Sequence, residues 1–316
     1  MNQNWVMQFE RFLLLAMCLL AVFACSSDDN EIPPPDAEPF NINIAVEAAR
    51  LSLQAYQQLN DHFDEQVFTL PAPYQLQKEF FTSEFFAGDL FDFDEEVPIG
   101  FVATTADIIY VVFRGTQTIS EWITNATFPQ VDYDFVDDGG KTYRGFTKIY
   151  QTINEAVITT VNDLIASGIY STLYVTGHSL GGALAVLAAP ELRDRTSLTP
   201  IMYNFAAPRV GDPSFSQRYS ELVKNSWRTV NSNDLVPTLP PTTVISFDDF
   251  PPQEVSYEHV FSKSEITFGK SINDPLDVLN IASNHDMCNY YSALCDQTDD
   301  PVTCKLLADS ADDCEP

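Results

Sequence analysis

The sequence predicts an α/β fold with a mainly parallel, mixed central sheet flanked by helices. Apolar runs of strand length alternate along the chain with longer segments whose apolar residues recur at helical spacing, and this alternation is typical of α/β proteins. The 316 residues are enough to bury a large core, and a hydrophobic fraction of 45% with 12% aromatic residues is ordinary for a globular domain. No break in composition divides the body of the chain, so we expect one domain over residues 40–316.

The expected elements follow from these patterns in chain order. Residues 44–59 predict a first helix, because Ile44, Ala48, Leu51, Ala55 and Leu59 fall on one helical face. Residues 146–167 predict a long amphipathic helix, and residues 180–192 predict an apolar one. The expected strands are 99–104, 108–113, 173–176, 201–205 and 227–230.

The charge of the chain excludes one class of partner. Asp and Glu number 45 against 16 Lys and Arg, which gives a net charge of −29. Such a surface repels the phosphates of nucleic acids, so we expect no nucleic-acid partner.

The N-terminus predicts export. The uncharged run from Phe12 to Cys25 is shorter than the roughly 20 residues of a membrane-spanning helix and suits a signal peptide over residues 1–24. Its end, Val22-Phe23-Ala24-Cys25, resembles the lipobox of bacterial lipoproteins, which implies a lipid anchor on Cys25 and contact with a membrane. The alternative is an ordinary cleaved signal. Residues 25–39, acidic and rich in proline, predict a linker. We therefore expect a bacterial outer-membrane lipoprotein or an extracellular protein.

Four cysteines lie close together near the C-terminus. Cys288, Cys295, Cys304 and Cys314 belong to a chain that we expect to be exported, which favours disulfides over free thiols. A zinc site is the alternative, but no C-x-x-C unit is present. Four cysteines allow three pairings, and the sequence does not choose among them.

The segment Gly177-His178-Ser179-Leu180-Gly181 carries the clearest chemical signal. It follows an expected strand and precedes an expected helix, which is the setting of a G-x-S-x-G nucleophile elbow. In such a turn the serine hydroxyl is exposed at the end of the strand. We therefore predict that Ser179 is a nucleophile.

A serine nucleophile requires a base and a carboxylate, in the chain order Ser, Asp or Glu, His. Asp234 stands in a loop after an expected strand, whereas Asp212 is more typical of a turn or helix start. Of the two histidines that follow Asp234, His259 is only 25 residues further on and His285 is 51 residues further on. The spacing favours His285 as the base, with His259 packing or bonding locally.

An acyl-transfer site also needs two N–H groups that stabilise an oxyanion. The residue after the serine, Leu180, is expected to supply one. The second should come from a loop after an early strand, and Phe113-Arg114-Gly115-Thr116 predicts Thr116 as that donor.

Five motifs together resemble the fungal-type triacylglycerol lipases, lipase class 3, of the α/β-hydrolase superfamily. They are GHSLGG, FRGTQTISEWITN, NFAAPRVGD, NDLVPTLPP and the Tyr257-to-Val260 element, in the family's order along the chain. The resemblance implies an α/β-hydrolase fold, Ser179 as nucleophile, Asp234 as triad acid and His285 as base. It also implies the two oxyanion donors Thr116 and Leu180. One departure is Tyr143, where the family usually has histidine.

In this family the segment after the oxyanion residue is a lid over the active site. Here that segment is Gln117–Phe128, and as a helix it would place Ile119, Trp122 and Ile123 on one side. The resemblance therefore implies a lid that opens at an oil–water interface.

The expected function is hydrolysis of carboxylic esters through an acyl-enzyme on Ser179, with a lipid or other ester bound at an interface and no metal or cofactor in the chemistry. Triacylglycerol lipase leads, and a feruloyl-type carboxylesterase or a phospholipase would use the same chemistry. A non-catalytic surface lipoprotein that binds lipids or glycans is the alternative from a different class. The oligomeric state is not predicted.

Overall fold

The computed structural model describes residues 36–83, 96–116, 128–246, 252–260, 262–271 and 278–307, together with Cys314. The expected signal peptide, the anchor at Cys25 and most of the linker lie outside the described residues. The lid residues Ile119, Trp122 and Ile123 also lie outside them.

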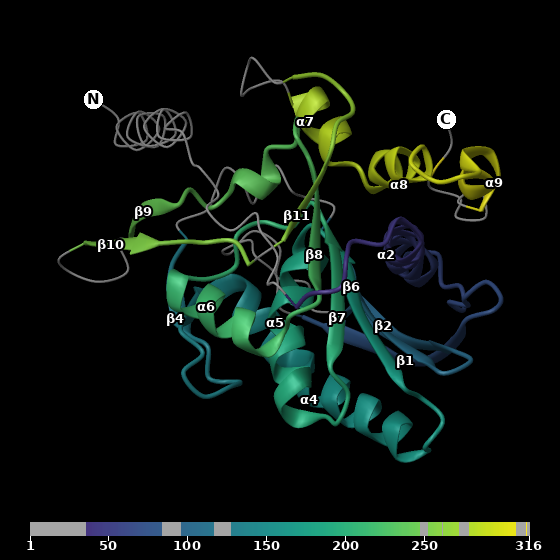
Figure 1. Cartoon of the computed structure of the whole chain (residues 1–316), viewed down its shortest axis with the longest axis horizontal. Helices are drawn as coiled ribbons and strands as arrows, with labels where there is room; N and C mark the ends of the chain where they lie inside the picture. The colour runs from purple at the N-terminus through teal and green to yellow at the C-terminus, as the bar shows by residue number, and fades with distance from the viewer. Residues whose placement is uncertain are drawn as a thin grey trace.

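A seven-stranded sheet forms the centre of the molecule (Figure 1). Its strand order is β1-β2-β3-β6-β7-β8-β11, and β1, β2 and β3 pair antiparallel whereas the pairs from β3 to β11 are all parallel. The bounds are β1 (Gln75–Thr82), β2 (Val97–Thr105), β3 (Ile108–Phe113), β6 (Thr172–His178), β7 (Pro200–Phe205), β8 (Ser226–Asn231) and β11 (Lys263–Ile266). Two small hairpins complete the described strands: β4 (Gln130–Asp132) with β5 (Lys141–Tyr143), and β9 (Thr243–Ser246) with β10 (Gln253–Ser256).

Helices cover both faces of the sheet. On one face lie α4 (Arg144–Ala166) and α5 (Leu180–Arg195), with α6 (Pro213–Leu222) beside α5, and on the other lie α2 (Ile42–Phe63) and α8 (Met287–Cys295) (Figure 1). The remaining helices are η1 (Val236–Thr238), α7 (Val278–His285) and α9 (Pro301–Leu306).

The alternation of side chains along the strands builds a core on each side of the sheet. In β3, Val111 and Phe113 pack under α4 and α5, whereas Tyr110 and Val112 pack toward α2. Because the central strands are covered on both faces, they are buried at nearly every position. Strand β3 is apolar throughout, whereas β6 and β8 also bury polar residues such as Thr176 and Arg228.

The predicted fold class is confirmed, and each element expected from the sequence is present within a few residues of its expected bounds. The pattern did not single out β1, whose exposed residues alternate irregularly, the short strands β4, β5, β9, β10 and β11, or the short helices after residue 277. A β-strand at the edge of a sheet and helices of six to nine residues leave weak periodic signals.

Disulfides hold the C-terminal helices together. Cys288 pairs with Cys314, and Cys295 at the end of α8 pairs with Cys304 in α9. Helix α8 itself packs on α2, so the disulfides join the C-terminal segment to a helix that lies against the sheet. The structure thereby selects one of the three pairings that the sequence allowed.

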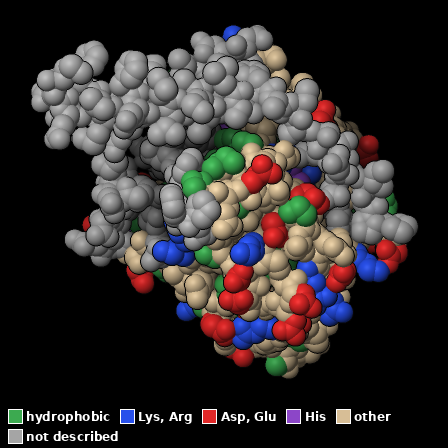
Figure 2. Space-filling view, turned by 90° about the vertical axis from the view of Figure 1, so that its left-hand side faces the viewer, with side chains coloured by type: hydrophobic (Ala, Val, Ile, Leu, Met, Phe, Trp, Pro, Cys, Tyr) green, Lys and Arg blue, Asp and Glu red, His purple; other side chains and the backbone are tan. Residues whose placement is uncertain are grey.

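The described surface is strongly charged. Figure 2 shows acidic side chains spread among basic ones over one face of the molecule. Within the described ranges, no helix is both long enough and apolar enough to cross a bilayer.

Candidate active site

Ser179 occupies a sharp turn between β6 and α5. Its backbone has φ 57° and ψ −122°, a conformation that L-residues rarely adopt, and its N–H donates to the Phe205 carbonyl at 2.9 Å. A Cβ on Gly177 would overlap the Gly181 backbone, and one on Gly181 would overlap the Phe113 carbonyl. Glycine at both positions therefore lets β6, β3 and α5 approach closely enough to hold the strained turn.

The loop expected to supply an oxyanion donor lies directly beside this turn. Arg114 is buried and donates from Nε to the Pro98 carbonyl at 2.8 Å and from a terminal nitrogen to the Gly115 carbonyl at 2.6 Å. Burial lowers the pKa of Arg114 to about 10. A Cβ on Gly115 would meet the His178 carbonyl, so the loop passes next to the residue that precedes Ser179. Thr116 follows at once. The Leu180 N–H begins α5 and has no acceptor within its own helix.

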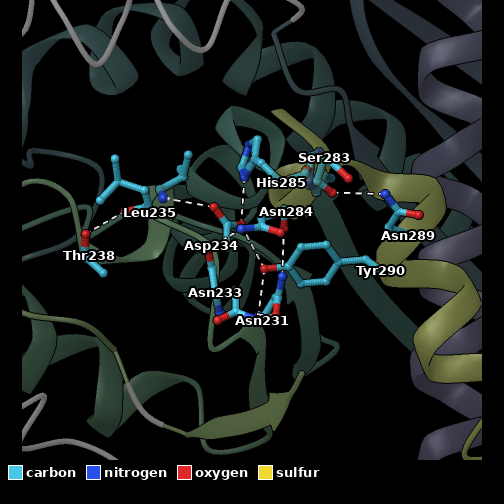
Figure 3. Close-up of polar contacts among 12 residues, drawn as sticks. Asn231, Asn233, Asp234, Leu235, Thr238, Ser283, Asn284, His285, Asn289 and Tyr290 are labelled. Atoms are coloured by element: carbon cyan, nitrogen blue, oxygen red, sulfur yellow. Dashed lines mark hydrogen bonds and ion pairs between the residues drawn. The ribbon is translucent and has the colours of Figure 1, made fainter. Parts of the chain in front are cut away.

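Asp234 lies beyond the carboxyl end of β8, in a loop on the same edge of the sheet as Ser179. Its carboxylate accepts three hydrogen bonds: from the Val236 N–H at 3.0 Å on Oδ1, and from Tyr290 and His285 at 2.8 Å each on Oδ2 (Figure 3). The side chain of Asp234 is fully buried. A buried carboxylate is tolerated when donors surround it in this way.

His285 ends α7, and its Nδ1 is the atom that meets Asp234. The ring is buried, and its centroid lies 4.7 Å from that of His178, the neighbour of Ser179. The structure therefore brings His285 to the elbow, although it lies 106 positions beyond Ser179 in the chain (285 minus 179).

Two atoms at the centre of this arrangement have no hydrogen-bond partner in the described structure: Ser179 Oγ and His285 Nε2. Both are buried, and buried polar atoms are normally paired. An unpaired hydroxyl at the elbow and an unpaired imidazole nitrogen on the ring next to His178 are the groups that a proton transfer to and from a bound substrate requires.

His178 connects the elbow to the base and to α2. A carbonyl only accepts, so His178 Nε2 carries hydrogen and donates to the His285 carbonyl at 2.8 Å. Burial, together with the neighbouring His285, holds the pKa of His178 well below its ordinary value, so the ring is neutral. Its Nδ1 then accepts from the Tyr56 hydroxyl at 2.7 Å.

The rival residues of the sequence analysis bond elsewhere. His259 is buried and donates from Nε2 to the Pro237 carbonyl at 2.7 Å, and burial with the nearby Arg228 and Arg209 holds its pKa well below the ordinary value. Asp212 caps α6 by accepting the Phe215 N–H at 2.8 Å, as the expected helix start requires. Tyr143, the departure from the family pattern, packs its ring on Phe146.

Sequence patterns did not identify Tyr56, Tyr290 or Asn284 as neighbours of the site. Each is one polar residue within a helix, and no motif or spacing separates it from other tyrosines and asparagines. Asn231 could have been predicted as a neighbour of the site, because it lies in the same Asn-Ser-Asn-Asp run as Asp234.

Comparisons of sequence point to one family. Residues 110–244 match the family described as lipase (class 3). A lipase of Rhizomucor miehei is 40% identical over 137 residues, which are 42% of this chain and 38% of that protein. The Caenorhabditis elegans lipase ZK262.3 is 33% identical over 244 residues, 74% of this chain and 63% of that protein. Secreted mono- and diacylglycerol lipase A of Penicillium cyclopium is 32% identical over 143 residues, 45% of this chain and 46% of that protein. This chain therefore spans less than half of the Rhizomucor and Penicillium proteins that it matches.

Solved structures agree. The native Rhizomucor miehei lipase propeptide complex superposes with a TM-score of 0.53 at 26% identity, over 78% of this chain and 86% of that one. A triacylglycerol lipase structure whose catalytic centre is described as a serine protease triad has a TM-score of 0.53 at 25% identity, over 80% of this chain and 94% of that one. The sequence match, the strand order and the serine elbow agree, and residues 110–244 belong to the lipase (class 3) family of α/β-hydrolases.

Proposed function

We propose that the protein is a serine hydrolase that cleaves carboxylic esters of lipids, with triacylglycerols as the leading substrate class. The observation that carries this proposal is the buried Asp234–His285 pair beside the strained turn of Ser179, with Ser179 Oγ and His285 Nε2 both unpaired. The relatives support it, because they are described as lipases and as mono- and diacylglycerol lipases.

In the first half of the proposed reaction, Ser179 Oγ attacks the ester carbonyl carbon while His285 Nε2 takes the hydroxyl proton. Asp234 keeps Nδ1–H oriented and stabilises the imidazolium that forms. The carbonyl oxygen becomes an oxyanion that accepts hydrogen bonds from the Leu180 and Thr116 N–H groups. The intermediate collapses, the bond to the alcohol breaks, and His285 returns its proton to the departing alcohol.

In the second half, water attacks the acyl-enzyme. His285 removes a proton from the water, the same two N–H groups bind the second oxyanion, and the Ser179–acyl bond breaks. The serine regains its proton from His285, and a fatty acid leaves. No co-reactant other than water is consumed.

The same proposal includes export. The two disulfides suit an oxidising compartment, and the Penicillium relative is described as secreted. Acylation at Cys25 in a bacterial lipoprotein is the finer proposal, and mass analysis of the mature N-terminus tests it. Interfacial activation by the segment 117–128 is proposed on the family resemblance.

A fluorophosphonate probe tests the nucleophile directly. We expect covalent labelling at Ser179, abolished in Ser179→Ala and unchanged in Ser220→Ala. The Ser220 hydroxyl donates to the Gln217 carbonyl within α6. Labelling at another serine, or ester hydrolysis that persists in Ser179→Ala, would overturn the proposal.

A panel of substrates then separates the ester classes. p-Nitrophenyl esters from short to long chains, emulsified triacylglycerol, a phospholipid and methyl ferulate are compared at equal enzyme concentration. Triacylglycerol lipase activity predicts the highest turnover on long-chain esters and a rise in rate once an emulsion forms. A preference for methyl ferulate or for phospholipid would replace triacylglycerol as the substrate class.

A further inference from the structure

Asn284, immediately before His285, uses every hydrogen-bonding group of its amide. Its Nδ2 donates to the Asn233 carbonyl at 2.9 Å and to the Lys270 carbonyl at 2.8 Å, and its Oδ1 accepts the Lys270 N–H at 3.3 Å. The residue is fully buried. A flipped amide would face two carbonyls with its oxygen, so these contacts determine its orientation.

A second amide makes the reciprocal connection. Asn231 Nδ2 donates to the Asn284 carbonyl at 3.0 Å, and Asn231 Oδ1 accepts the N–H groups of Asn233 and Phe268 at 3.2 Å each (Figure 3). The Asn231 side chain thus bonds the carbonyl of the residue before His285, and the Asn284 side chain bonds the carbonyl of the residue before Asp234. Asn233 directly precedes Asp234, and Asn284 directly precedes His285.

The segment after β11 packs closely against the Asn284 side chain. Gly269 has φ +70°, and a Cβ there would overlap Asn284 Oδ1. Lys270, the next residue, supplies both a donor and an acceptor to the same amide. The loops after β8 and β11 therefore both bond to one buried side chain of α7.

We propose that Asn284 is a positioning residue for the base, and that its amide holds the His285 and Asp234 loops in the register that the reaction needs. The inference rests on the proposed function. The 2.8 Å contact with Asp234 orients the His285 ring, and the His178 bond holds the His285 carbonyl at the elbow. The Asn284 bonds add the two contacts that tie the backbone before His285 to the loops after β8 and β11. A displacement of about 1 Å at a reacting group can cost about 10²-fold in rate.

The test compares Asn284→Ala with Asn289→Ala in the full chain. Asn289 is a matched control, because its exposed amide donates one bond to the Ser283 carbonyl at the same α7–α8 junction. We expect Asn284→Ala to lower kcat for p-nitrophenyl butyrate about 10- to 100-fold, with KM changed by less than about twofold. Asn289→Ala should stay within about twofold of the wild type in both constants.

Fluorophosphonate labelling separates positioning from mere stabilisation. If Asn284 only stabilised the fold, its loss would lower the fraction of protein that is labelled, while folded molecules would react at the wild-type rate. Positioning predicts full labelling with a rate constant reduced by the same factor as kcat. Wild-type labelling and kcat in a folded Asn284→Ala protein, checked by circular dichroism, would overturn the inference.

A second variant covers the case in which Asn284→Ala does not fold. Gly269→Ala leaves all the amide groups in place, but its Cβ would displace the Asn284 amide, and its left-handed φ would strain the backbone next to Lys270. We expect it to lower kcat with little change in KM, and a folded Gly269→Ala protein with wild-type kcat would overturn the inference. If the wild type neither hydrolyses esters nor labels at Ser179, the proposed function itself fails, which is a different result from an active wild type with an unaffected variant.

Discussion

Replacing Tyr290 with phenylalanine should destabilise the protein far more than the loss of one ordinary hydroxyl. The Tyr290 hydroxyl donates to Asp234 Oδ2 at 2.8 Å and accepts the Asn231 N–H at 2.8 Å. Burial and the Asp234 charge raise the pKa of Tyr290 well above its ordinary value, so the hydroxyl keeps its proton and donates. Tyr290→Phe removes the bond to a charged acceptor and leaves a buried backbone N–H without a partner.

The size of the effect follows from these two losses. A hydrogen bond to a charged group contributes about 1.5–3 kcal/mol, and an unsatisfied buried donor costs about 1–3 kcal/mol. The free energy of unfolding should therefore fall by about 3 kcal/mol or more. Asp234 keeps its bonds to Val236 and His285, so kcat for soluble esters should fall by less than about tenfold.

Tyr291→Phe is the matched control for this measurement. Tyr291 is the adjacent buried tyrosine of α8, and its hydroxyl donates to a neutral acceptor, the Cys304 carbonyl, at 2.7 Å. Its replacement should cost about 1 kcal/mol. Urea unfolding of both variants and the wild type gives the comparison. If Tyr290→Phe costs no more than Tyr291→Phe, the reasoning about the buried carboxylate is refuted.

Three further predictions concern histidines and a disulfide. His285→Ala should lower kcat about 10⁴-fold or more, whereas folded His259→Ala should retain most of its activity, and the reverse order in ester assays would reassign the base. Replacing Cys295 and Cys304 together by alanine should lower the free energy of unfolding by about 2.5 kcal/mol, because their disulfide closes a short loop and so restricts the unfolded chain. Urea unfolding measures the loss, and a value under about 1 kcal/mol would contradict this reasoning. The fold depresses the pKa of His178 and of His259, so below about pH 6.5 the unfolded chain takes up protons that the native protein does not. As the pH is lowered below that value, the free energy of unfolding should decrease by about 1.4 kcal/mol per pH unit for each histidine. Thermal unfolding from pH 7 to 5 measures this loss, and a slope that His259→Gln leaves unchanged would argue against it.

Local sequence patterns predicted the main helices and the central strands well. The apolar period of α4 and the uninterrupted apolar run of α5 are properties of short windows, and both helices begin and end within about three residues of their expected bounds. The turn at Ser179 was also readable, because a serine between glycines at a strand-to-helix junction is a local feature. The edge strand β1 and the short helix α9 were missed, since neither repeats its pattern often enough to stand out.

The residues of the candidate site were predicted from the sequence, but their geometry was not. Asp234 and His285 were selected by chain order, spacing and family motifs, none of which states a distance. The structure adds that their side chains lie 2.8 Å apart. The lid segment and the anchor at Cys25 lie outside the described residues and stay predictions.

The α/β class, the serine elbow and the acidic character of the chain follow from the sequence alone, because periodicity, turn chemistry and charge are set by neighbouring residues or by composition. Packing of distant segments establishes which cysteines pair, that Tyr56 bonds to His178 and His178 to the His285 carbonyl, and that Asn231 and Asn284 connect the acid loop to the base loop. Each of these contacts joins residues that come from different elements, and most join residues distant along the chain. Whether such residues meet depends on how strand order and packing direct their loops, a property that no local pattern encodes.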